Sequence, residues 1–385
     1  MRILVAGEEA CVRHQLQSYL SSWGHECVLA PDSRTALRLT EQCDFDIALL
    51  DAPVPVLPAT LLVSRIRQAS ADRFVYVLLC APRAQQAEVV RGFDAGADDY
   101  LFKPFDREVL RMRIRTAERL VSLTRAMAQS NARLERELAQ ARAVLNNMLP
   151  RVPEGGPVDL AWFFEPCAYL GGDLFNAHAL DQDRVSVYGF DVAGHGVASA
   201  LLAVMLGNML RPWSSHGLLG APLGTLGHDS LGSPAEVAGL LNERFPFEGL
   251  VDLYFTLFYG VIDRRRGVLD WVRAGHPPAL LVRNEGLVLL ELGDPPIGFL
   301  EGHQYTAHST PLGCGDRLVL YSDGITEARA PDGVAFGLDR LCTAVTSLRA
   351  APLHSLVGEV QRSLVDHRGS RQFDDDLSML VVEAR

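Results

Sequence analysis

Cysteine is scarce in this chain, and no two cysteines are closely spaced. Seven cysteines are scattered over 385 residues without a Cys-x-x-Cys pair. An odd, dispersed set is typical of reduced thiols in a cytosolic protein and argues against a disulfide framework. We therefore expect a cytoplasmic protein with free thiols.

Long apolar runs and a leader segment are also missing. The longest apolar run, Gly196 to Leu210, is too short to span a bilayer and ends at Arg211-Pro212. The N-terminus, Met1-Arg-Ile-Leu-Val, starts a strand pattern at once, so no signal peptide is visible. These features predict a protein without a membrane partner.

The sequence has no excess of basic charge. It carries 36 Lys and Arg against 47 Asp and Glu, a formal net charge of −11. Because phosphate backbones attract basic surfaces, this balance argues against nucleic-acid binding, and no basic helix-turn-helix is visible. A hydrophobic content of 48% is enough for buried cores, and the length favours two domains with a connector.

Residues 1–106 alternate apolar strands with amphipathic helices such as Glu9 to Trp23 and Ser33 to Gln42. We expect strands at Arg2 to Ala6, Glu26 to Ala30, Ile47 to Leu50, Val75 to Cys80 and Tyr100 to Phe102. Continuous apolar strands separated by helices indicate an α/β domain with a doubly wound, parallel five-stranded sheet. Ligands bind at the carboxyl ends of such strands, where Asp51 and Lys103 lie.

This segment resembles the receiver domain of two-component response regulators. In that resemblance Asp51 matches the phosphoacceptor, Lys103 matches the cation that senses the phosphoryl group, and Tyr100 takes the aromatic switch position. An aspartate nucleophile needs a divalent ion such as Mg²⁺ to screen the incoming phosphate. The resemblance implies a cognate sensor kinase as partner.

The receiver-like segment departs from the usual pattern at its metal and phosphoryl positions. The acidic pair after the first strand is Gly7-Glu8, with Glu9 beyond, so one carboxylate is missing. Cys80 replaces a hydroxyl residue and is a much weaker hydrogen-bond donor. Two alternatives stay open: phosphorylation at Asp51, or a pseudo-receiver kept as a docking and dimerising scaffold.

Residues 107–149 have the heptad spacing of a coiled coil. Apolar or small residues recur at steps of three and four, with Arg and Glu on the other faces. The series is Leu110, Ile114, Ala117, Val121, Thr124 and Ala128, then Leu134, Leu138, Ala141, Leu145 and Met148. A long helix with one narrow apolar stripe is unfavourable alone in water, so we predict a parallel dimer. The alternative is a helix that packs back on its own domain.

Four acidic sites in residues 150–385 stand at strand ends or in glycine-rich turns. They are Asp173 in Gly171-Gly172-Asp173, Asp191 after Val185 to Phe190, Asp323 after Arg317 to Tyr321, and the Asp375/Asp376 pair before Leu377 to Val382. Any one such Asp can simply cap a turn. Carboxylates held together repel unless a hard cation such as Mg²⁺ or Mn²⁺ sits between them, so the set of four indicates a metal site.

The same region predicts two antiparallel sheets with helices outside. Expected strands include Tyr254 to Asp263, Leu269 to Ala274, Ala279 to Arg283 and Leu287 to Leu292. Expected helices are Val197 to Leu210, Ser233 to Glu243, Gly337 to Leu348 and Leu353 to Asp366. Pro212 to Pro234 is rich in Gly, Ser and Leu, which predicts a mobile loop or a plain linker.

Six motifs occur in the order seen in the metal-dependent PPM (protein phosphatase 2C-like) serine/threonine phosphatases. They are "GGDLF", "DVAGHG", "TLFYGVID", "AGHPPALL", "LVLYSDGITEA" and "DDDLSMLVV". The chain resembles the bacterial branch that serves sigma-factor partner switching, over roughly Asp159 to Arg385. The resemblance implies an α+β domain: an antiparallel β-sandwich flanked by helices.

The resemblance also implies roles for single residues. Asp191 would bridge two ions, with Asp173 and the Val192 carbonyl on one ion, and with Asp323 and Asp375 on the other. Asp376 would orient a bound water. Asn176 stands where a second Asp is common, and its amide would hold water without adding charge.

Two histidines and a run of three arginines invite other roles that we do not favour. His195 and His276 could act as general acids, but structural roles are favoured. Arg264 to Arg266 is interpreted as a solvated turn rather than a phosphate clamp.

The combined interpretation is a cytoplasmic, homodimeric response regulator with a receiver (1–106), a coiled-coil helix (107–149) and a phosphatase domain (150–385). The implied activity is dephosphorylation of phosphoserine or phosphothreonine on an anti-sigma-factor antagonist, controlled by the receiver. The alternative is a non-catalytic adaptor that binds a sigma factor or its antagonist. Retention of Asp173, Asp191, Asp323 and Asp375 argues against the adaptor.

Overall fold

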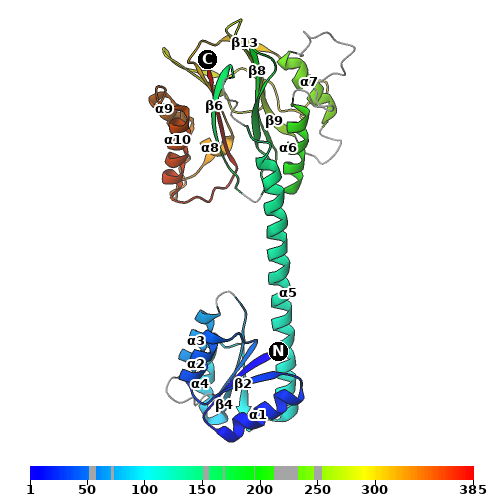
Figure 1. Ribbon diagram of the computed structural model, residues 1–385, viewed down its shortest axis with the longest axis vertical. Helices are drawn as coiled ribbons and strands as arrows, with labels where there is room; N and C mark the ends of the chain where they lie inside the picture. Colours follow the sequence, from blue (N-terminus) through cyan, green and yellow to red (C-terminus); the bar gives the residue numbers. More distant parts are fainter. Residues whose placement is uncertain are drawn as a thin grey trace. The chain divides into compact units, whose positions relative to one another are not determined.

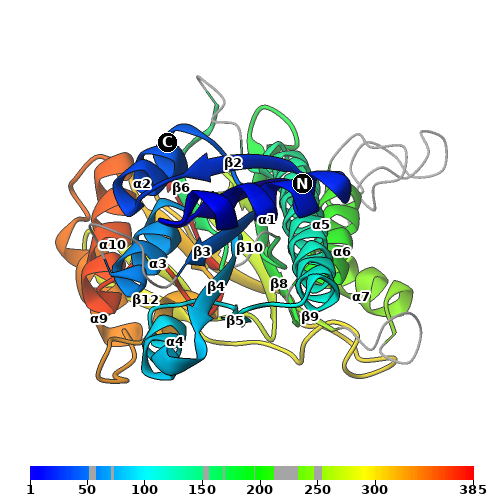
Figure 2. The same ribbon diagram turned by 90° about the horizontal axis from the view of Figure 1, so that it is seen from below.

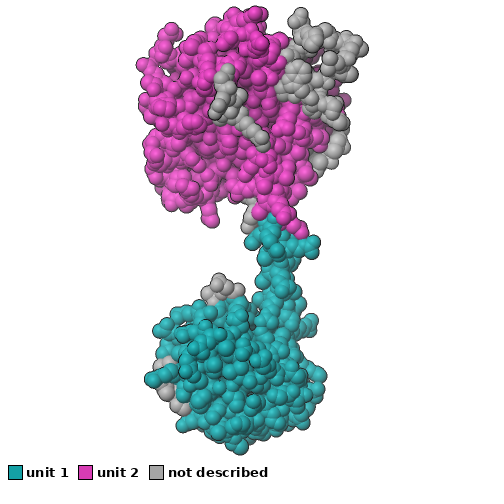
Figure 3. All heavy atoms as spheres, viewed as in Figure 1, with its two compact units in different colours: residues 1–136 teal, residues 137–385 magenta. Residues whose placement is uncertain are grey.

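A computed structural model describes residues 1–51, 58–70, 73–150, 156–167, 170–194, 196–211, 233–246 and 254–385. The chain forms two compact units, Met1–Arg136 and Glu137–Arg385 (Figure 3). His195 and most of the segment Pro212 to Pro234 lie outside the described residues. No helix in the described ranges has both the length and the apolar content needed to cross a bilayer.

The first unit is built on the expected parallel sheet of five strands, in the order β2-β1-β3-β4-β5. The strands are β1 (Arg2–Ala6), β2 (Glu26–Ala30), β3 (Ile47–Asp51), β4 (Tyr76–Pro82) and β5 (Asp99–Lys103). The helices between them are α1 (Ala10–Ser22), α2 (Ser33–Gln42), α3 (Ala59–Ala69), the 3-10 turn Arg83–Gln85 and α4 (Gln86–Asp94). The prediction of a doubly wound α/β domain is confirmed.

Successive β1 residues point to opposite faces of this sheet, as strand geometry requires. Leu4 packs in the core beneath α2 and α3, whereas Ile3 packs in the core beneath α1 and the start of α5. Figure 2 shows these helices on the two sides of the sheet. Both faces are covered, which explains why the strands have continuous apolar sequences.

Helix α5 (Arg107–Asn146) confirms the predicted long helix, but its apolar stripe is used differently from the prediction. The residues Leu110, Ile114, Ala117 and Val121 are at most 1% exposed and belong to the core of the first unit. The alternative of a helix that packs on its own domain therefore holds for this part. Near the other end, Leu145 is buried in the second unit. The exposed apolar residues of α5 include Leu120, Leu123, Met127, Leu134 and Val144.

The second unit is a sandwich of two antiparallel sheets, as predicted. One sheet has the order β13-β10-β9-β8-β7 and the other β12-β11-β14-β15-β6. The strands are β6 (Val158–Glu165), β7 (Leu174–Ala179), β8 (Arg184–Val192), β9 (Phe255–Asp263), β10 (Val268–Ala274), β11 (Ala279–Arg283), β12 (Gly286–Leu290), β13 (His308–Pro311), β14 (Arg317–Tyr321) and β15 (Leu377–Ala384). Sequence patterning missed β6, β7 and β13.

Helices cover the outer faces of the sandwich (Figure 1). They are α6 (Val197–Met209) and α7 (Pro234–Arg244) against the β8–β9 sheet, and α9 (Leu338–Ser347) and α10 (Leu353–Arg368) against the other; the short α8 (Asp323–Glu327) follows β14. Inward residues of both sheets, such as Val187 and Leu320, share one core. Residues such as Val319 form a second core with α9 and α10.

Candidate functional site

The acids predicted from the sequence come together at one end of the sandwich. Asp191 is the second-last residue of β8, Asp323 starts α8 after β14, and Asp375 stands two residues before β15. Asp173, Asp323 and Asp375 all lie close enough to the carboxylate of Asp191 to shift its pKa. Segments more than 180 residues apart in the chain therefore place their carboxylates in one region.

Burial and mutual repulsion make these carboxylates hard to ionise. Burial, followed by the charge of Asp323, raises the pKa of Asp191 to about 7. Burial, followed by the charge of Asp191, raises the pKa of Asp173 well above its usual value. Burial and then Asp375 raise the pKa of Asp323. A divalent cation bound among these carboxylates would favour their ionised forms.

Asp173 supplies the clearest indication of a missing partner. Its side chain is 3% exposed, and its Oδ2 atom is buried with no hydrogen-bond partner among the described residues. A buried carboxylate oxygen without a partner is costly, and hard oxygen ligands suit Mg²⁺ or Mn²⁺. In the described ranges no three Asp, Glu, His or Cys side chains are already arranged as metal ligands. The evidence that these residues suit a divalent metal ion is therefore their set of carboxylate oxygens and the Asp173 Oδ2 atom without a partner among the described residues.

The glycines of the GGD turn are required by close contacts. A Cβ on Gly171 would lie 1.9 Å from Asp376 Oδ2, and a Cβ on Gly172 would lie 2.7 Å from the Val192 carbonyl oxygen. Asp376 accepts hydrogen bonds of 2.9 Å from the main-chain N–H groups of Cys167 and Gly172. Asp376 thus holds the turn that carries Asp173, a role that sequence reasoning missed.

A serine and a glycine join the two C-terminal acidic turns. Ser322 Oγ donates to the Asp376 carbonyl oxygen at 3.0 Å and accepts from the Ser378 N–H at 3.0 Å. A Cβ on Gly324 would lie 2.2 Å from the same Asp376 carbonyl oxygen. The turn after β14 is therefore locked against the start of β15, which fixes Asp323 beside Asp375.

Asn176 does not have the surroundings that the sequence suggested. It is 4% exposed. Its Nδ2 donates to the Met148 carbonyl oxygen at 2.5 Å, and its Oδ1 accepts from the Ala177 N–H at 2.7 Å. The amide is therefore engaged by the main chain near the end of α5, which leaves the idea of a water-holding amide without support.

The remaining polar positions in the second unit behave as structural groups. Arg264 and Arg265 pair with Asp183, and all three arginines of the Arg264 to Arg266 turn are exposed, so the solvated turn is confirmed. His276 is buried, and its Nδ1 lies 2.9 Å from Thr256 Oγ1. His195 lies outside the described residues.

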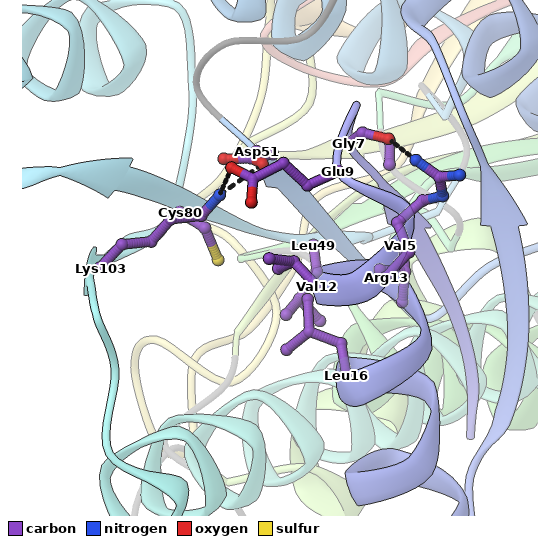
Figure 4. Close-up of a pocket in the computed structure, with 11 residues that line it drawn as sticks. Val5, Gly7, Glu9, Val12, Arg13, Leu16, Leu49, Asp51, Cys80 and Lys103 are labelled. Atoms are coloured by element: carbon purple, nitrogen blue, oxygen red, sulfur yellow. Dashed lines mark hydrogen bonds and ion pairs between the residues drawn. The ribbon is translucent and has the colours of Figure 1, made fainter.

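The receiver-like site lies at the carboxyl ends of the parallel strands of the first unit (Figure 4). Lys103 Nζ lies 2.5 Å from Asp51 Oδ2 and 3.7 Å from Glu9 Oε1. The thiol of Cys80 is fully buried, and burial followed by the charge of Asp51 raises its pKa to about 12. A neutral thiol is a weak donor to a phosphoryl group, as the sequence indicated.

In the loop after β1, Gly7 lies against Asp51, and Arg13 holds the main chain of the loop. A Cβ on Gly7 would lie 2.9 Å from the Cβ of Asp51. Arg13 Nη1 donates to the carbonyl oxygen of Gly7 at 2.5 Å, a contact visible in Figure 4. The same atom donates to the carbonyl oxygen of Glu8 at 2.6 Å. One acid is absent, Glu8 does not line the pocket, and Lys103 is close to Asp51 and Glu9, so the residues fit a divalent ion less well than those of the second unit.

Tyr100 stands outside the lining of that pocket. It lies in β5 and makes edge contacts with Phe93 and Phe102, with ring centroids 5.8 Å and 5.0 Å apart. Lys103, by contrast, lines the pocket and is the single lysine in the printed sequence, where every other Lys or Arg position is an arginine. The one ammonium side chain of the protein is therefore placed against Asp51.

Two family models match the chain. The model "Stage II sporulation protein E (SpoIIE)" matches residues 181–385, and the model "Response regulator receiver domain" matches residues 3–115. The two matches agree with the parallel α/β unit and with the unit that holds the acidic cluster.

Two similar proteins each match about two thirds of this chain. Protein IcfG of Synechocystis is 29% identical over 262 residues, covering 64% of this chain and 41% of that protein. The phosphoserine phosphatase RsbP of Bacillus subtilis is 28% identical over 252 residues, covering 65% of this chain and 58% of that protein. This chain therefore spans about half the length of these two relatives.

A solved structure shares the fold of the second unit. The SiaA-PP2C domain of Pseudomonas aeruginosa superposes with a TM-score of 0.55 at 19% identity, covering 67% of this chain and all of that domain. The likeness establishes a PP2C-like fold. With more than half of its length matched by one family model, the chain belongs to the stage II sporulation protein E (SpoIIE) family and carries a receiver domain at its N-terminal end.

Proposed function

We propose that this chain is a response regulator whose second unit hydrolyses phosphoserine or phosphothreonine esters on a partner protein, using two divalent ions. The observation that carries the proposal is the buried Asp173 Oδ2, which has no hydrogen-bond partner among the residues that the structure describes, in a cluster of carboxylates with raised pKa values. A relative described as a phosphoserine phosphatase supports the reaction class. The proposed substrate is a phosphorylated anti-sigma-factor antagonist.

In this proposal Asp173, Asp191 and the Val192 carbonyl hold one Mg²⁺ or Mn²⁺ ion, and Asp191, Asp323 and Asp375 hold the other. When bound, the ions acidify the attacking water and neutralise charge on the phosphate ester. The protein residues supply orientation: Asp376 holds the turn of Asp173, and Ser322 locks Asp323 beside Asp375. Both supports keep the carboxylates in place before the ions arrive.

The first unit is proposed to control this activity, with a sensor kinase as its partner and Asp51 as the phosphoacceptor. Gly7, which stands in place of one metal-site carboxylate, supports the alternative, a pseudo-receiver that signals through docking. The two possibilities differ in whether acetyl phosphate with Mg²⁺ labels Asp51. Exposed apolar residues of α5 support a homodimer in either case.

The decisive experiment is phosphate release by the purified full chain with Mn²⁺. Aryl phosphates and phosphoserine peptides are suitable substrates. We expect Asp191→Ala to lose activity by at least about a thousandfold, because it removes the bridging carboxylate. Asp332→Ala, at an exposed turn of the same unit, is the matched control and should keep full activity. Without phosphate release by the wild type, the non-catalytic adaptor would become the better interpretation.

A further inference from the structure

His276 is a buried, neutral ring in the turn that follows β10. His276 is 3% exposed. Burial, followed by the charge of Arg273, lowers the pKa of its imidazole to about 3. Its Nδ1 atom lies 2.9 Å from Oγ1 of Thr256 in β9. A neutral imidazole with one nitrogen held by a neighbour has a defined tautomer, and that neighbour then has a defined hydrogen-bond direction.

The main chain around His276 is fixed on both sides. Gly275 has a φ of +68°, and a Cβ there would lie 2.5 Å from Pro296 Cγ, so glycine is required. Arg273 Nη1 donates to the His276 carbonyl oxygen at 2.7 Å. The position of the ring is therefore set by the turn rather than by chance rotation of an exposed side chain.

The ring lies beside the face of β8 that carries Asp191. Gly189 and Asp191 are two residues apart and share that face, and a Cβ on Gly189 would lie 3.5 Å from His276 Nε2. Thr256 is the residue directly opposite Asp191 in the β8–β9 register. Directly opposed residues in an antiparallel pair have Cβ atoms about 4.5–5.5 Å apart on the same face.

We propose that His276 and Thr256 form a positioning pair for Asp191, in which the ring fixes the Thr256 hydroxyl and the hydroxyl orients the carboxylate for metal binding. If Nδ1–H donates to Thr256 Oγ1, the hydroxyl proton stays available for the acid that faces it across the strands. The pair touches neither substrate nor ions. This inference rests on the proposed function, because it assigns the pair to the same metal site.

Metal affinity tests the pair without relying on turnover. Mn²⁺ titration calorimetry on the full chain should show about tenfold weaker binding for Thr256→Val, which keeps the shape but loses the hydroxyl. Thr256→Ser keeps the hydroxyl and should bind within about twofold of the wild type. His276→Phe should weaken binding like Thr256→Val, and the double variant should lose no more than either single one, because the two residues act as a unit.

A spectroscopic measurement separates positioning from packing. In metal-free wild type, the ¹⁵N signals of His276 should show a neutral ring protonated at Nδ1, and Thr256→Val should shift them while Thr256→Ser should not. Unchanged Mn²⁺ affinity in Thr256→Val, equal loss in Thr256→Ser, or an Nδ1 without a proton would each overturn the proposal. A wild type that binds Mn²⁺ but releases no phosphate would instead refute the proposed function and leave the pair to be judged by titration.

Discussion

The side-chain amide of Asn176 donates to the main-chain carbonyl of Met148, with 2.5 Å between Nδ2 and the oxygen. Met148 lies just beyond helix α5, and Asn176 lies three residues after Asp173. Packing supports the same junction, because a Cβ on Gly207 would meet Met148 Cε at 2.9 Å and Leu174 Cδ2 at 2.5 Å. An aspartate at position 176 could still accept a hydrogen bond from the Ala177 N–H but could not donate one to the Met148 carbonyl. This difference explains why asparagine suits position 176 better than aspartate.

Loss of that amide should loosen the end of α5. In Asn176→Ala the buried Met148 carbonyl loses its donor, a cost of about 1–3 kcal/mol. We expect faster amide hydrogen exchange over residues 145–149 of the full chain, measured by mass spectrometry. Asn147→Ala changes an exposed neighbour in the same segment and should leave the exchange rates unchanged. Equal rates in the two variants would show that the amide contributes nothing to this junction.

A methyl group on Gly171 should disable the acidic cluster without unfolding the protein. The added Cβ would lie 1.9 Å from Asp376 Oδ2, so the GGD turn and Asp173 must shift. We expect Gly171→Ala to lower phosphatase activity by about 10–100-fold, the usual effect of disturbing a group that orients metal ligands. Phosphate release and Mn²⁺ titration would both report the change.

The matched control is Gly239→Ala in the interior of α7, where no described heavy atom lies within 4 Å of the added carbon. This substitution should stabilise the protein by about 0.4–1 kcal/mol and leave activity unchanged, because it restricts the unfolded chain. Wild-type activity in Gly171→Ala would contradict the tight contact between that turn and Asp376.

The stability of the metal-free protein should fall as the pH rises from about 4 to about 7. The pKa of Asp191 is raised from 3.8 to about 7, so in this window the folded state binds more protons than the unfolded state. Ionisation of the buried carboxylate is then a cost of folding, and Asp173 and Asp323 act in the same direction. Thermal melting of the full chain with a chelator, at several pH values, measures the effect.

Asp191→Asn is the comparison that isolates this carboxylate. An amide cannot ionise, so the variant should lose less stability over the same pH range than the wild type. Mn²⁺ affinity of the wild type should rise with pH, because metal binding displaces protons. If the melting temperature rose equally in both proteins from pH 4 to pH 7, ionisation of Asp191 would not destabilise the folded protein.

The fold could largely be predicted because each unit has the hydrophobic pattern of its sheet. Continuous apolar strands such as Ile47 to Leu50 need two covered faces, which is a property of the local sequence. The packing partner of the apolar stripe of α5 is harder to predict. The spacing of Leu110, Ile114 and Ala117 is the same whether these residues face a partner helix or the receiver sheet. Which of these two surfaces the stripe covers depends on tertiary packing, which the local sequence does not encode.

The acids could be predicted as a group because each follows a strand or stands among glycines. Their supports could not be predicted in the same way. Asp376 binds the N–H group of Gly172, 204 residues away in the chain, and no local pattern encodes such a contact. The glycine in Ser322-Asp323-Gly324 was a usable signal, since only a residue without a Cβ fits against the Asp376 carbonyl.

Lys103 should stabilise the receiver unit through its contact with Asp51. The two side chains are 15% and 7% exposed and 2.5 Å apart. Lys103→Met would leave the Asp51 carboxylate buried without its cation, so we expect a loss of about 3–5 kcal/mol, seen as a lower melting temperature of that unit. Because the chain has one lysine, ¹⁵N-lysine labelling gives a single side-chain signal that reports the pair directly.

Neutralising both partners should restore much of the stability lost in Lys103→Met. Asp51→Asn combined with Lys103→Met removes the uncompensated charge, so its melting temperature should lie above that of Lys103→Met alone. Arg65→Met, at an exposed position of α3, is the control for loss of a surface charge and should be neutral. If the double variant melted no higher than Lys103→Met, the buried charge would not be the cause.

The exposed stripe of α5 should hold the homodimer; Leu120 and Met127 lie one residue before the predicted seam positions Val121 and Ala128, and Leu134 belongs to both. Leu120, Met127 and Leu134 are seven residues apart and 42%, 67% and 53% exposed, whereas Val121 is buried in its own unit. Met127→Glu would remove about 1.5–3 kcal/mol of apolar burial per chain and oppose two like charges in a parallel pair. Light scattering after size-exclusion chromatography should then show monomers at micromolar concentration. Ala132→Glu adds the same charge at an exposed position away from the stripe and should leave the dimer intact; a monomeric wild type would rule out this role for α5.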